Sequence, residues 1–404
     1  MDSPAFDPLS ADFLAHPYSK YAALRRAHPV FFSDRLGAWV LTRYADCARV
    51  LSDTDAFASD PTRFGRELPP SAVSLQTLDP PLHRELRHPF LAAMRLQDLD
   101  AWQAATEAVG TALLQAAADR PFDFINEFAE PLALRSMAHL FGVTDRIDEH
   151  KFRRVSRDIV LGMDAGLDPS RTEPCAKARI TLNHMIESWF ADTTVTGLVA
   201  DLRRLGSSSA APFDQLINTA RVMFHAGYSS LSSFLGNAVG WLARRQLLHA
   251  ATLQAADSRM TDELLRLDSS VQAVFRMCAE DLDIQQHRLR TGDGVIALVG
   301  AANHDPEIFP DPAVAHFTRS PNPHLSLGRG IHACLGGHLA GRVTTGVLRL
   351  LGSRCTRLEL AAPPVQRASA TLRGLDALPL HAVPGNPQLS ATGSGERRTV
   401  IETP

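Results

Sequence analysis

The sequence predicts one large, mainly helical domain with a small β portion. Apolar residues recur at helical spacing through most of the segment from about residue 80 to residue 250. Two short strand-like runs lie near the N-terminus, and neither an internal repeat nor a linker interrupts the middle of the chain. We therefore expect residues 1–384 to form a single domain. Residues 385–404 are polar and rich in Gly, Ser and Pro, so we expect a flexible tail there.

The first half of the chain is expected to contain two strands and then a series of helices. A short helix in 19–29 precedes two strands in 30–44, which are joined by the turn sequence DRLG. Pro89 should kink or end the first long helix, because proline cannot donate a backbone hydrogen bond. The helical segments of this half are 83–118, 124–143, 149–163 and 177–195.

The second half should contain a long apolar helix at 221–245 and a C-terminal helix at 336–353. Between them we expect a helix at 261–267, with Thr261 as its N-cap, and strands at 271–279 and 294–302. The long helix is unusual because four serines and three glycines interrupt it, and both residue types weaken a helix relative to alanine.

Composition and charge exclude several classes of protein. Hydrophobic residues make up 45% of the 404 residues, which is enough for a large core, and the net charge of -3 argues against a nucleic-acid binder. The five cysteines are scattered without CxxC spacing, which favours a reducing compartment. The N-terminus shows no signal peptide, and we see no apolar run of about 18 residues. We expect a cytoplasmic protein that does not bind membranes.

The stretch HLSLGRGIHACLGGHLAGR carries the chemistry. Cys334 stands just before a helix whose first turn contains Gly336 and Gly337, and backbone N–H groups at a helix N-terminus stabilise a thiolate. Gly328 and Gly330 allow a tight turn and leave room for a flat ligand. The absence of nearby cysteines argues against zinc or an iron–sulfur cluster. Two possibilities remain for Cys334, which are a single thiolate that ligates haem iron and an inert buried cysteine.

The spacing Gly328-x-Gly330-x-His332-x-Cys334-x-Gly336 resembles the haem-ligand loop of the cytochrome P450 family. The resemblance covers nearly the whole chain, because other matching pieces occur in the family's order. They are GAWVLTRYADCARVL, DPPLHRELR, ELLR, GAANHDPEIFPDP and LRGLDALPL. Together they identify the chain as a member of the soluble bacterial class. The resemblance implies a fold in which haem b lies between the long central helix and the cysteine loop.

The resemblance also implies roles for individual residues. Cys334 would be the metal ligand, and Glu263, Arg266 and Arg319 would form the family's buried structural triad. Leu327 stands where the family usually has phenylalanine, which leaves a smaller neighbour beside the sulfur. The remaining residues expected to bind the cofactor, through its propionates or by shaping the loop, are His83, Arg87, Arg276, His332, Gly328, Gly330 and Gly336.

On the long helix, Ala226-Gly227-Tyr228-Ser229-Ser230 matches the family's Ala/Gly-Gly-x-Asp/Glu-Thr. We expect Ala226 and Gly227 to let the helix approach the porphyrin, and the following hydroxyls to face the iron. Ser229 replaces the acid that helps to deliver protons, and serine cannot supply a proton at neutral pH. Either water and Ser230 suffice, or the substrate brings an acidic hydrogen, or the enzyme is a slower hydroxylase.

These residues predict a haem-thiolate monooxygenase that tailors a specialised metabolite. Substrate-facing positions are expected near 64–75, 224–230 and 271–274, and the serines with Gln272 favour a substrate with polar groups. We expect hydroxylation or oxidative coupling of an aromatic or peptidic substrate with O2. The alternatives are a peroxide-driven fatty-acid hydroxylase, a haem sensor and a helper protein of the same fold. The first of these has no support from the long helix, because no arginine lies between Phe224 and Ser233.

Basic residues near the cysteine predict an acidic redox partner. The segment from His324 to Arg357 contains five arginines and no Asp or Glu. We expect a small ferredoxin to dock there, with a reductase that passes electrons from NAD(P)H. A carrier protein that presents the substrate stays open as a second partner. The residues of this expected basic face are Arg84, Arg95, Arg329, Arg342, Arg349, Arg354 and Arg357.

Overall fold

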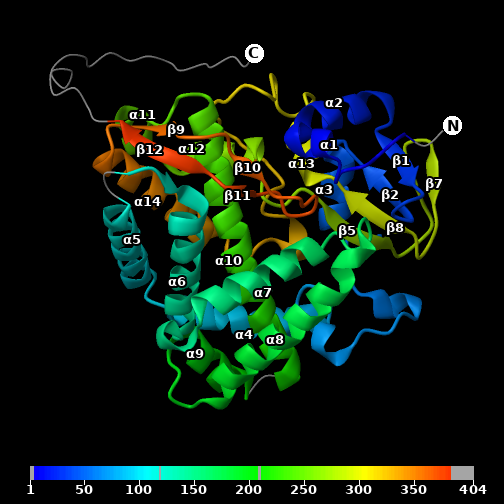
Figure 1. Cartoon of the computed structure of the whole chain (residues 1–404). Helices are drawn as coiled ribbons and strands as arrows, with labels where there is room; N and C mark the ends of the chain where they lie inside the picture. The colour runs from blue at the N-terminus through cyan, green and yellow to red at the C-terminus, as the bar shows by residue number, and fades with distance from the viewer. Residues whose placement is uncertain (1–3, 118–119, 208–210, 384–404) are drawn as a thin grey trace.

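The computed structural model of the chain describes residues 4–117, 120–207 and 211–383, and it is mainly helical as predicted (Figure 1). The expected tail lies outside the described residues. A π-helix spans Phe124–Ala129. The α-helices are α1 (Ala11–Ala15), α2 (Pro17–Ala27), α3 (Tyr44–Ser52), α4 (Leu82–Leu96), α5 (Leu99–Ala116), α6 (Glu130–Phe141), α7 (Glu149–Gly162), α8 (Thr172–Ala191), α9 (Gly197–Gly206), α10 (Phe213–Arg244), α11 (Ala250–Gln254), α12 (Ser258–Leu267), α13 (Val299–Ala302) and α14 (Gly337–Arg354).

The strands form a small five-stranded sheet and three smaller ones. The larger sheet has the order β1-β2-β8-β5-β3, in which only the β2–β8 pair is parallel, and it lies beside α1, α2, α3 and α13 in Figure 1. β9, β12 and β4 form a second sheet. The strands are β1 (Val30–Ser33), β2 (Ala38–Leu41), β3 (Phe57–Ala58), β4 (Phe122–Asp123), β5 (Val274–Cys278), β6 (Leu282–Ile284), β7 (His287–Leu289), β8 (Gly294–Ala297), β9 (Arg357–Leu360), β10 (Val365–Gln366), β11 (Leu375–Ala377) and β12 (Pro379–Val383).

Local sequence explains several helix ends. Asp98 and Asp148 accept backbone N–H hydrogen bonds at the starts of α5 and α7, and Gly142 ends α6 in the left-handed conformation with φ of 75°. One detail of the prediction was wrong. Asp257, not Thr261, caps α12, and Thr261 is buried with its hydroxyl bonded to that of Thr345.

For Pro89 the structure excludes one of the two expected outcomes, because Pro89 lies inside α4 and does not end it. One further expectation needs correction. The strand expected at 294–302 stops at β8, and the chain then turns into α13, where it packs against α2 and α3.

The long helix α10 crosses the middle of the molecule, where its glycines admit neighbouring side chains (Figure 1). A Cβ atom added to Gly227 would lie 2.5 Å from Cε of Met137 on α6. A Cβ atom on Gly236 would lie 2.5 Å from Cδ1 of Ile125 in the π-helix. These glycines therefore allow close packing of α10 against the α6 side of the molecule, which outweighs their cost in helix propensity.

The expected buried triad is present. The guanidinium of Arg266 donates to both carboxylate oxygens of Glu263 at 2.8 and 2.9 Å, and both side chains are fully buried. Arg319 Nε donates to the same carboxylate at 3.1 Å. Arg266 also donates to the carbonyl oxygens of Asn303 and Pro312, so the triad joins α12 to the chain that leads toward the cysteine loop.

Within the described ranges, no helix is both long enough and apolar enough to cross a membrane.

Candidate functional site

The cysteine loop adopts the expected geometry. A short 3-10 turn at Gly330–His332 precedes Cys334, and α14 begins at Gly337 with Gly336 as its N-cap. The backbone N–H groups of Gly336 and Gly337 hydrogen-bond to the cysteine sulfur. Cys334 can be reached by solvent, yet the protein surrounds the sulfur on its other sides. This burial raises the pKa of the Cys334 thiol, and the glycine N–H groups oppose the increase.

Two glycines give the loop its shape. Gly328 and Gly330 both have φ of 69°, a conformation that L side chains rarely adopt. A Cβ atom on Gly330 would also lie 3.0 Å from the carbonyl oxygen of Leu51 at the end of α3. Leu327 packs over the start of α14, since a Cβ atom on Gly337 would lie 3.1 Å from its Cδ1. The loop can therefore hold Cys334 rigidly with little side-chain bulk around it.

The four expected cationic residues converge beside Cys334 from three elements. His83 and Arg87 lie on α4, Arg276 on β5 and His332 in the 3-10 turn. The rings of His83 and His332 have centroids 4.4 Å apart, and Arg87 donates to the carbonyl oxygen of Ala333 at 2.9 Å. Burial and the charges of His332, Arg87 and Arg276 together lower the pKa of His83 to about 4, although the charge of Asp79 opposes the decrease. Two guanidinium groups and two imidazoles, of which that of His83 is neutral at pH 7, thus share one small region.

One carboxylate lies within this cluster. Burial would raise the pKa of Asp79, but the nearby His332, whose Nε2 lies 3.9 Å from the carboxylate, and hydrogen bonds from the N–H groups of Ser59 and Asp60 and from Arg63 hold it well below its ordinary value. Sequence reasoning missed Asp79, although it stands four residues before His83 and could have been read from the same motif.

The cationic cluster has capacity left for a ligand. Nε2 of His83 is buried and has no hydrogen-bond partner among the described residues. A buried polar atom without a hydrogen-bond partner destabilises the folded protein, so its presence indicates that a bound group supplies the missing partner. The cluster suits a ligand that places two carboxylates beside a thiolate, as the haem expected from the sequence would.

On α10, only part of the expected distal arrangement is present. Ala226 is the one exposed residue of α10 between Asp214 and Arg244, and Ser230 is partly exposed one turn further on. These two residues share a face, as expected. Ser229 is 3% exposed and lines a different pocket beside Glu130 of α6. The expectation that both hydroxyls face the iron side was therefore wrong for Ser229.

The other serines of α10 also serve packing. The hydroxyl of Ser232 donates to the carbonyl oxygen of Ser229 at 3.3 Å, and that of Ser233 accepts from Arg367 at 2.9 Å. Gly227 faces Met137 of α6, so its role in letting a porphyrin approach is not supported by its surroundings.

The expected contribution of Gln272 to a polar substrate pocket is not supported by its surroundings. Gln272 is 2% exposed, and its side chain donates to the carbonyl oxygen of Ser269 at 2.6 Å. Phe224 is fully buried among Phe141, Phe152 and Trp189, so it faces the core. Gln272 and the buried serines therefore no longer support a substrate with polar groups, whereas Ser230 keeps a partly exposed position beside Ala226.

His225, next to the distal residues, packs against α7. Its Nε2 lies 3.0 Å from the hydroxyl of Ser156, and the residue is 6% exposed. Burial lowers the pKa of His225 from 6.5 to about 4.

This shift predicts a loss of stability in mild acid. Between pH 6.5 and pH 4 the unfolded chain takes up a proton at His225 that the folded chain excludes. The free energy of unfolding should therefore be lower at pH 5 than at pH 7, with His225 contributing on the order of 2 kcal/mol of the loss. The variant His225→Gln keeps a hydrogen-bonding side chain that does not titrate, and denaturant unfolding should show a smaller loss. Equal losses in the variant and the parent would contradict the assignment.

The expected basic face is only partly available. Arg84 and Arg329 are exposed. Arg342 pairs with Asp100 at 2.7 Å, and Arg349 donates to the carbonyl oxygen of Ala256 at 2.8 Å. Arg84 on α4 and Arg329 in the loop are therefore exposed, as are Arg95 and Arg354. Arg342 and Arg349 of α14 are engaged within the protein.

Known proteins share this fold and sequence pattern. The family model for cytochrome P450 matches residues 258–349. A beta-dihydromenaquinone-9 omega-hydroxylase of Mycobacterium tuberculosis is 30% identical over 395 residues, covering 94% of this chain and 78% of the relative. A 6-deoxyerythronolide B hydroxylase of Saccharopolyspora erythraea is 30% identical over 394 residues, covering 90% and 95%.

A solved structure agrees with these relatives. The structure of P450BioI in complex with an acyl carrier protein ligated to hexadec-9Z-enoic acid has a TM-score of 0.79 and 27% identity, and the match covers 92% of this chain and all of that chain, 100%. The chain belongs to the cytochrome P450 family, and it is an oxidoreductase of the monooxygenase type that depends on haem.

Proposed function

We propose that this enzyme is a haem-thiolate monooxygenase that hydroxylates a largely apolar specialised metabolite. The observation that carries the proposal is the convergence of Cys334 with His83, Arg87, Arg276 and His332, together with the unpartnered Nε2 of His83. The names of relatives that act as hydroxylases on a menaquinone and on a macrolide precursor support the reaction class. Oxidative coupling of an aromatic or peptidic substrate stays a prediction, and it has lost the support of a polar pocket.

In this proposal the chain's own residues hold haem b on two sides. Cys334 ligates the iron, and its sulfur is steadied by the N–H groups of Gly336 and Gly337. His83, Arg87, Arg276 and His332 would bind the propionates, with the two guanidinium groups balancing their charges and the imidazoles acting as hydrogen-bond partners. The bound haem supplies the activation of O2 that inserts one oxygen atom into a C–H bond.

Ser230 is the residue of α10 best placed to handle protons at the distal face. It is partly exposed beside Ala226, whereas Ser229 lies on another face of the helix. A serine hydroxyl accepts one proton as it passes on another, so it relays protons but does not supply them. Proton delivery at this face thus depends on Ser230 together with water, and small side chains at Ala226 and Ser230 leave space for it.

The other functions have less support. α10 carries no arginine between Phe224 and Ser233, so the arginine that a peroxide-driven fatty-acid hydroxylase would use is absent from that stretch. The relatives are named hydroxylases, which argues against a sensor or a helper protein.

The proposal predicts a selective response in a ligand screen of the ferric enzyme. A steroid, a macrolide precursor, an isoprenoid quinone, a fatty acid and an aromatic cyclic dipeptide would be titrated while the haem absorption band is recorded. We expect the large apolar ligands to displace the iron-bound water, and turnover to give products heavier by one oxygen. A response confined to the dipeptide, with products lighter by two hydrogens, would favour oxidative coupling instead.

A carrier-bound substrate is a second candidate. The P450BioI structure contains a fatty acyl group on an acyl carrier protein, which supports testing the same arrangement here. Each ligand that binds in the screen would be compared as the free acid and as its pantetheine thioester. Tighter binding of the thioester would support a carrier.

An acidic ferredoxin is proposed to dock near Arg84 and Arg329, two of the exposed arginines of the expected basic face. Reversing the charge in Arg84→Glu should slow electron transfer from ferredoxin about tenfold at low ionic strength, since steering by charge accelerates association by that order or more. Stopped-flow reduction at several salt concentrations measures this. The control Arg26→Glu changes an exposed arginine on α2 and should leave the rate unchanged. Equal rates for Arg84→Glu and the parent would count against this surface.

A further inference from the structure

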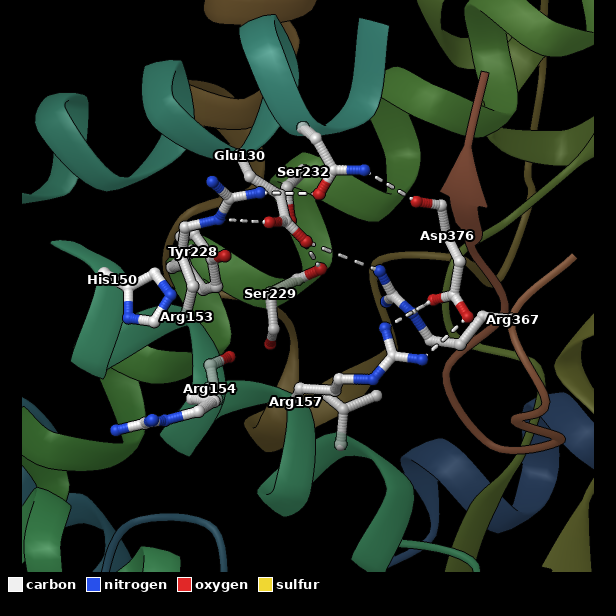
Figure 2. A pocket seen from close by; sticks show the side chains of 13 residues that line it. Glu130, His150, Arg153, Arg154, Arg157, Tyr228, Ser229, Ser232, Arg367 and Asp376 are labelled. Atoms are coloured by element: carbon white, nitrogen blue, oxygen red, sulfur yellow. Dashed lines mark hydrogen bonds and ion pairs between the residues drawn. The ribbon is translucent and has the colours of Figure 1, made fainter. Parts of the chain in front are cut away.

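A second polar pocket lies apart from the cysteine loop, between α6, α7, α10 and β11 (Figure 2). Its volume is about 310 Å³, which is within the range for small-molecule sites. None of its lining residues belongs to the cysteine loop or to α4. The charged residues in its wall are Arg153, Arg154, Arg157, Arg367, Glu130 and Asp376.

The pairing of these groups leaves positive charge in excess. Arg157 binds both oxygens of Asp376 at 2.8 and 2.9 Å, and Nε of Arg367 donates to the same carboxylate at 3.2 Å. The carboxylate of Asp376 therefore accepts hydrogen bonds from two guanidinium groups. Arg153 pairs with Glu130 at 2.6 Å, which uses the second carboxylate. Among the described residues Arg154 has no partner, and Figure 2 shows its guanidinium turned away from Asp376. The pocket wall thus holds four arginines for two carboxylates.

The helix α10 contributes neutral hydrogen-bonding groups to the same wall. Ser229, Ser232 and Tyr228 line the pocket from α10. Figure 2 shows Ser229 between His150 and Arg157 in this view. α10 therefore supplies no negative charge where the arginines of α7 face it.

We propose that this pocket binds a small oxyanion, such as a phosphate or carboxylate group of a soluble metabolite. Guanidinium groups bind both kinds of oxyanion through paired N–H donors, and the hydroxyl of Ser229 adds a further donor. The anion balances the positive charge of the four arginines that the carboxylates of Asp376 and Glu130 leave uncompensated. The site is separate from the haem site, so its occupancy can be measured without turnover.

The test is calorimetric titration of the holoenzyme with inorganic phosphate and, separately, with succinate at constant ionic strength. We expect saturable binding of at least one of them. Binding by phosphate alone identifies a phosphate site, binding by succinate alone a dicarboxylate site, and binding by both a general oxyanion site.

Two variants locate the binding in this pocket. Ser229→Asp places a carboxylate beside Arg157 and should weaken binding about tenfold or more, while Ser229→Asn has nearly the same size without the charge and should weaken it less. Arg157→Ala should weaken binding by a similar factor to Ser229→Asp, and Asp376 would keep Arg367 as a partner. Arg26→Ala is the control for an exposed arginine elsewhere.

Three results would overturn the proposal. They are the lack of saturable binding by either anion, equal weakening in Ser229→Asp and Ser229→Asn, and equal weakening in Arg157→Ala and Arg26→Ala. None of them bears on the haem site, since all readouts are binding measurements that do not depend on oxidation of a substrate.

Discussion

Replacing Cys334 with serine is expected to abolish product formation and the thiolate signature of the reduced, CO-bound enzyme. Serine has nearly the same size as cysteine, so the N–H groups of Gly336 and Gly337 still find an acceptor and the loop keeps its shape. A hydroxyl does not ionise to a ligand of comparable strength at neutral pH, whereas a thiol that coordinates a metal ion is deprotonated. The variant should fold with the stability of the parent and yet lack activity above background.

The control is Cys355→Ser, which changes a half-buried cysteine just beyond the end of α14. It should keep both the thiolate signature and the activity. If Cys334→Ser retained the thiolate signature, a different cysteine would be the ligand, and the assignment of the site would fail.

Removing the carboxylate of Glu263 should produce the largest loss of stability among single substitutions outside the haem site. Glu263→Ala leaves the fully buried guanidinium of Arg266 without its charge partner, and breaking a buried pair from one side costs about 3–5 kcal/mol. Arg319 and the backbone N–H of His316 would lose the same acceptor. The free energy of unfolding by denaturant, measured with haem bound, gives the loss directly.

Two comparisons make this result interpretable. Glu263→Gln keeps the shape and some hydrogen bonds but not the charge, so it should lose less stability than the alanine variant. Arg135→Ala breaks an exposed ion pair with Glu149 and should have a much smaller effect. A loss for Glu263→Ala no greater than for Arg135→Ala would show that the triad is not a major source of stability.

The fold class and the cysteine loop could be predicted because their causes are local. The left-handed conformations at Gly328 and Gly330 require glycine, and the thiolate requires the helix start that follows it. These requirements leave fixed spacings in the sequence. The triad of Glu263, Arg266 and Arg319 was predicted from the family resemblance, and the structure confirms its contacts.

The directions of side chains around α10 could not be predicted from the sequence, because they depend on neighbours distant in the chain. Gly227 faces Met137, and Ser233 faces Arg367, which is 134 residues away. Helical spacing alone does not say which face meets the cofactor. The same limit explains Gln272, whose side-chain amide donates a hydrogen bond to a neighbouring carbonyl oxygen and not to a substrate.

The charged surfaces show this limit as well. The run of arginines after His324 suggested a continuous basic face, but Arg342 is paired with Asp100, which is 242 residues away. The oxyanion pocket was not anticipated, because its arginines come from α7 and from the segment before β11 and meet only in the folded chain. Clusters formed by distant segments have no signature in a single sequence.

The central claim is that this enzyme inserts one oxygen atom from O2 into an apolar substrate, and isotope labelling tests it most directly. A substrate that displaces the iron-bound water in the ligand screen would be turned over with a ferredoxin, its reductase and NADPH under ¹⁸O2. We expect a product that carries one ¹⁸O atom, and none in Cys334→Ser. A product that contains no label, or that has only lost two hydrogens, would contradict the claim.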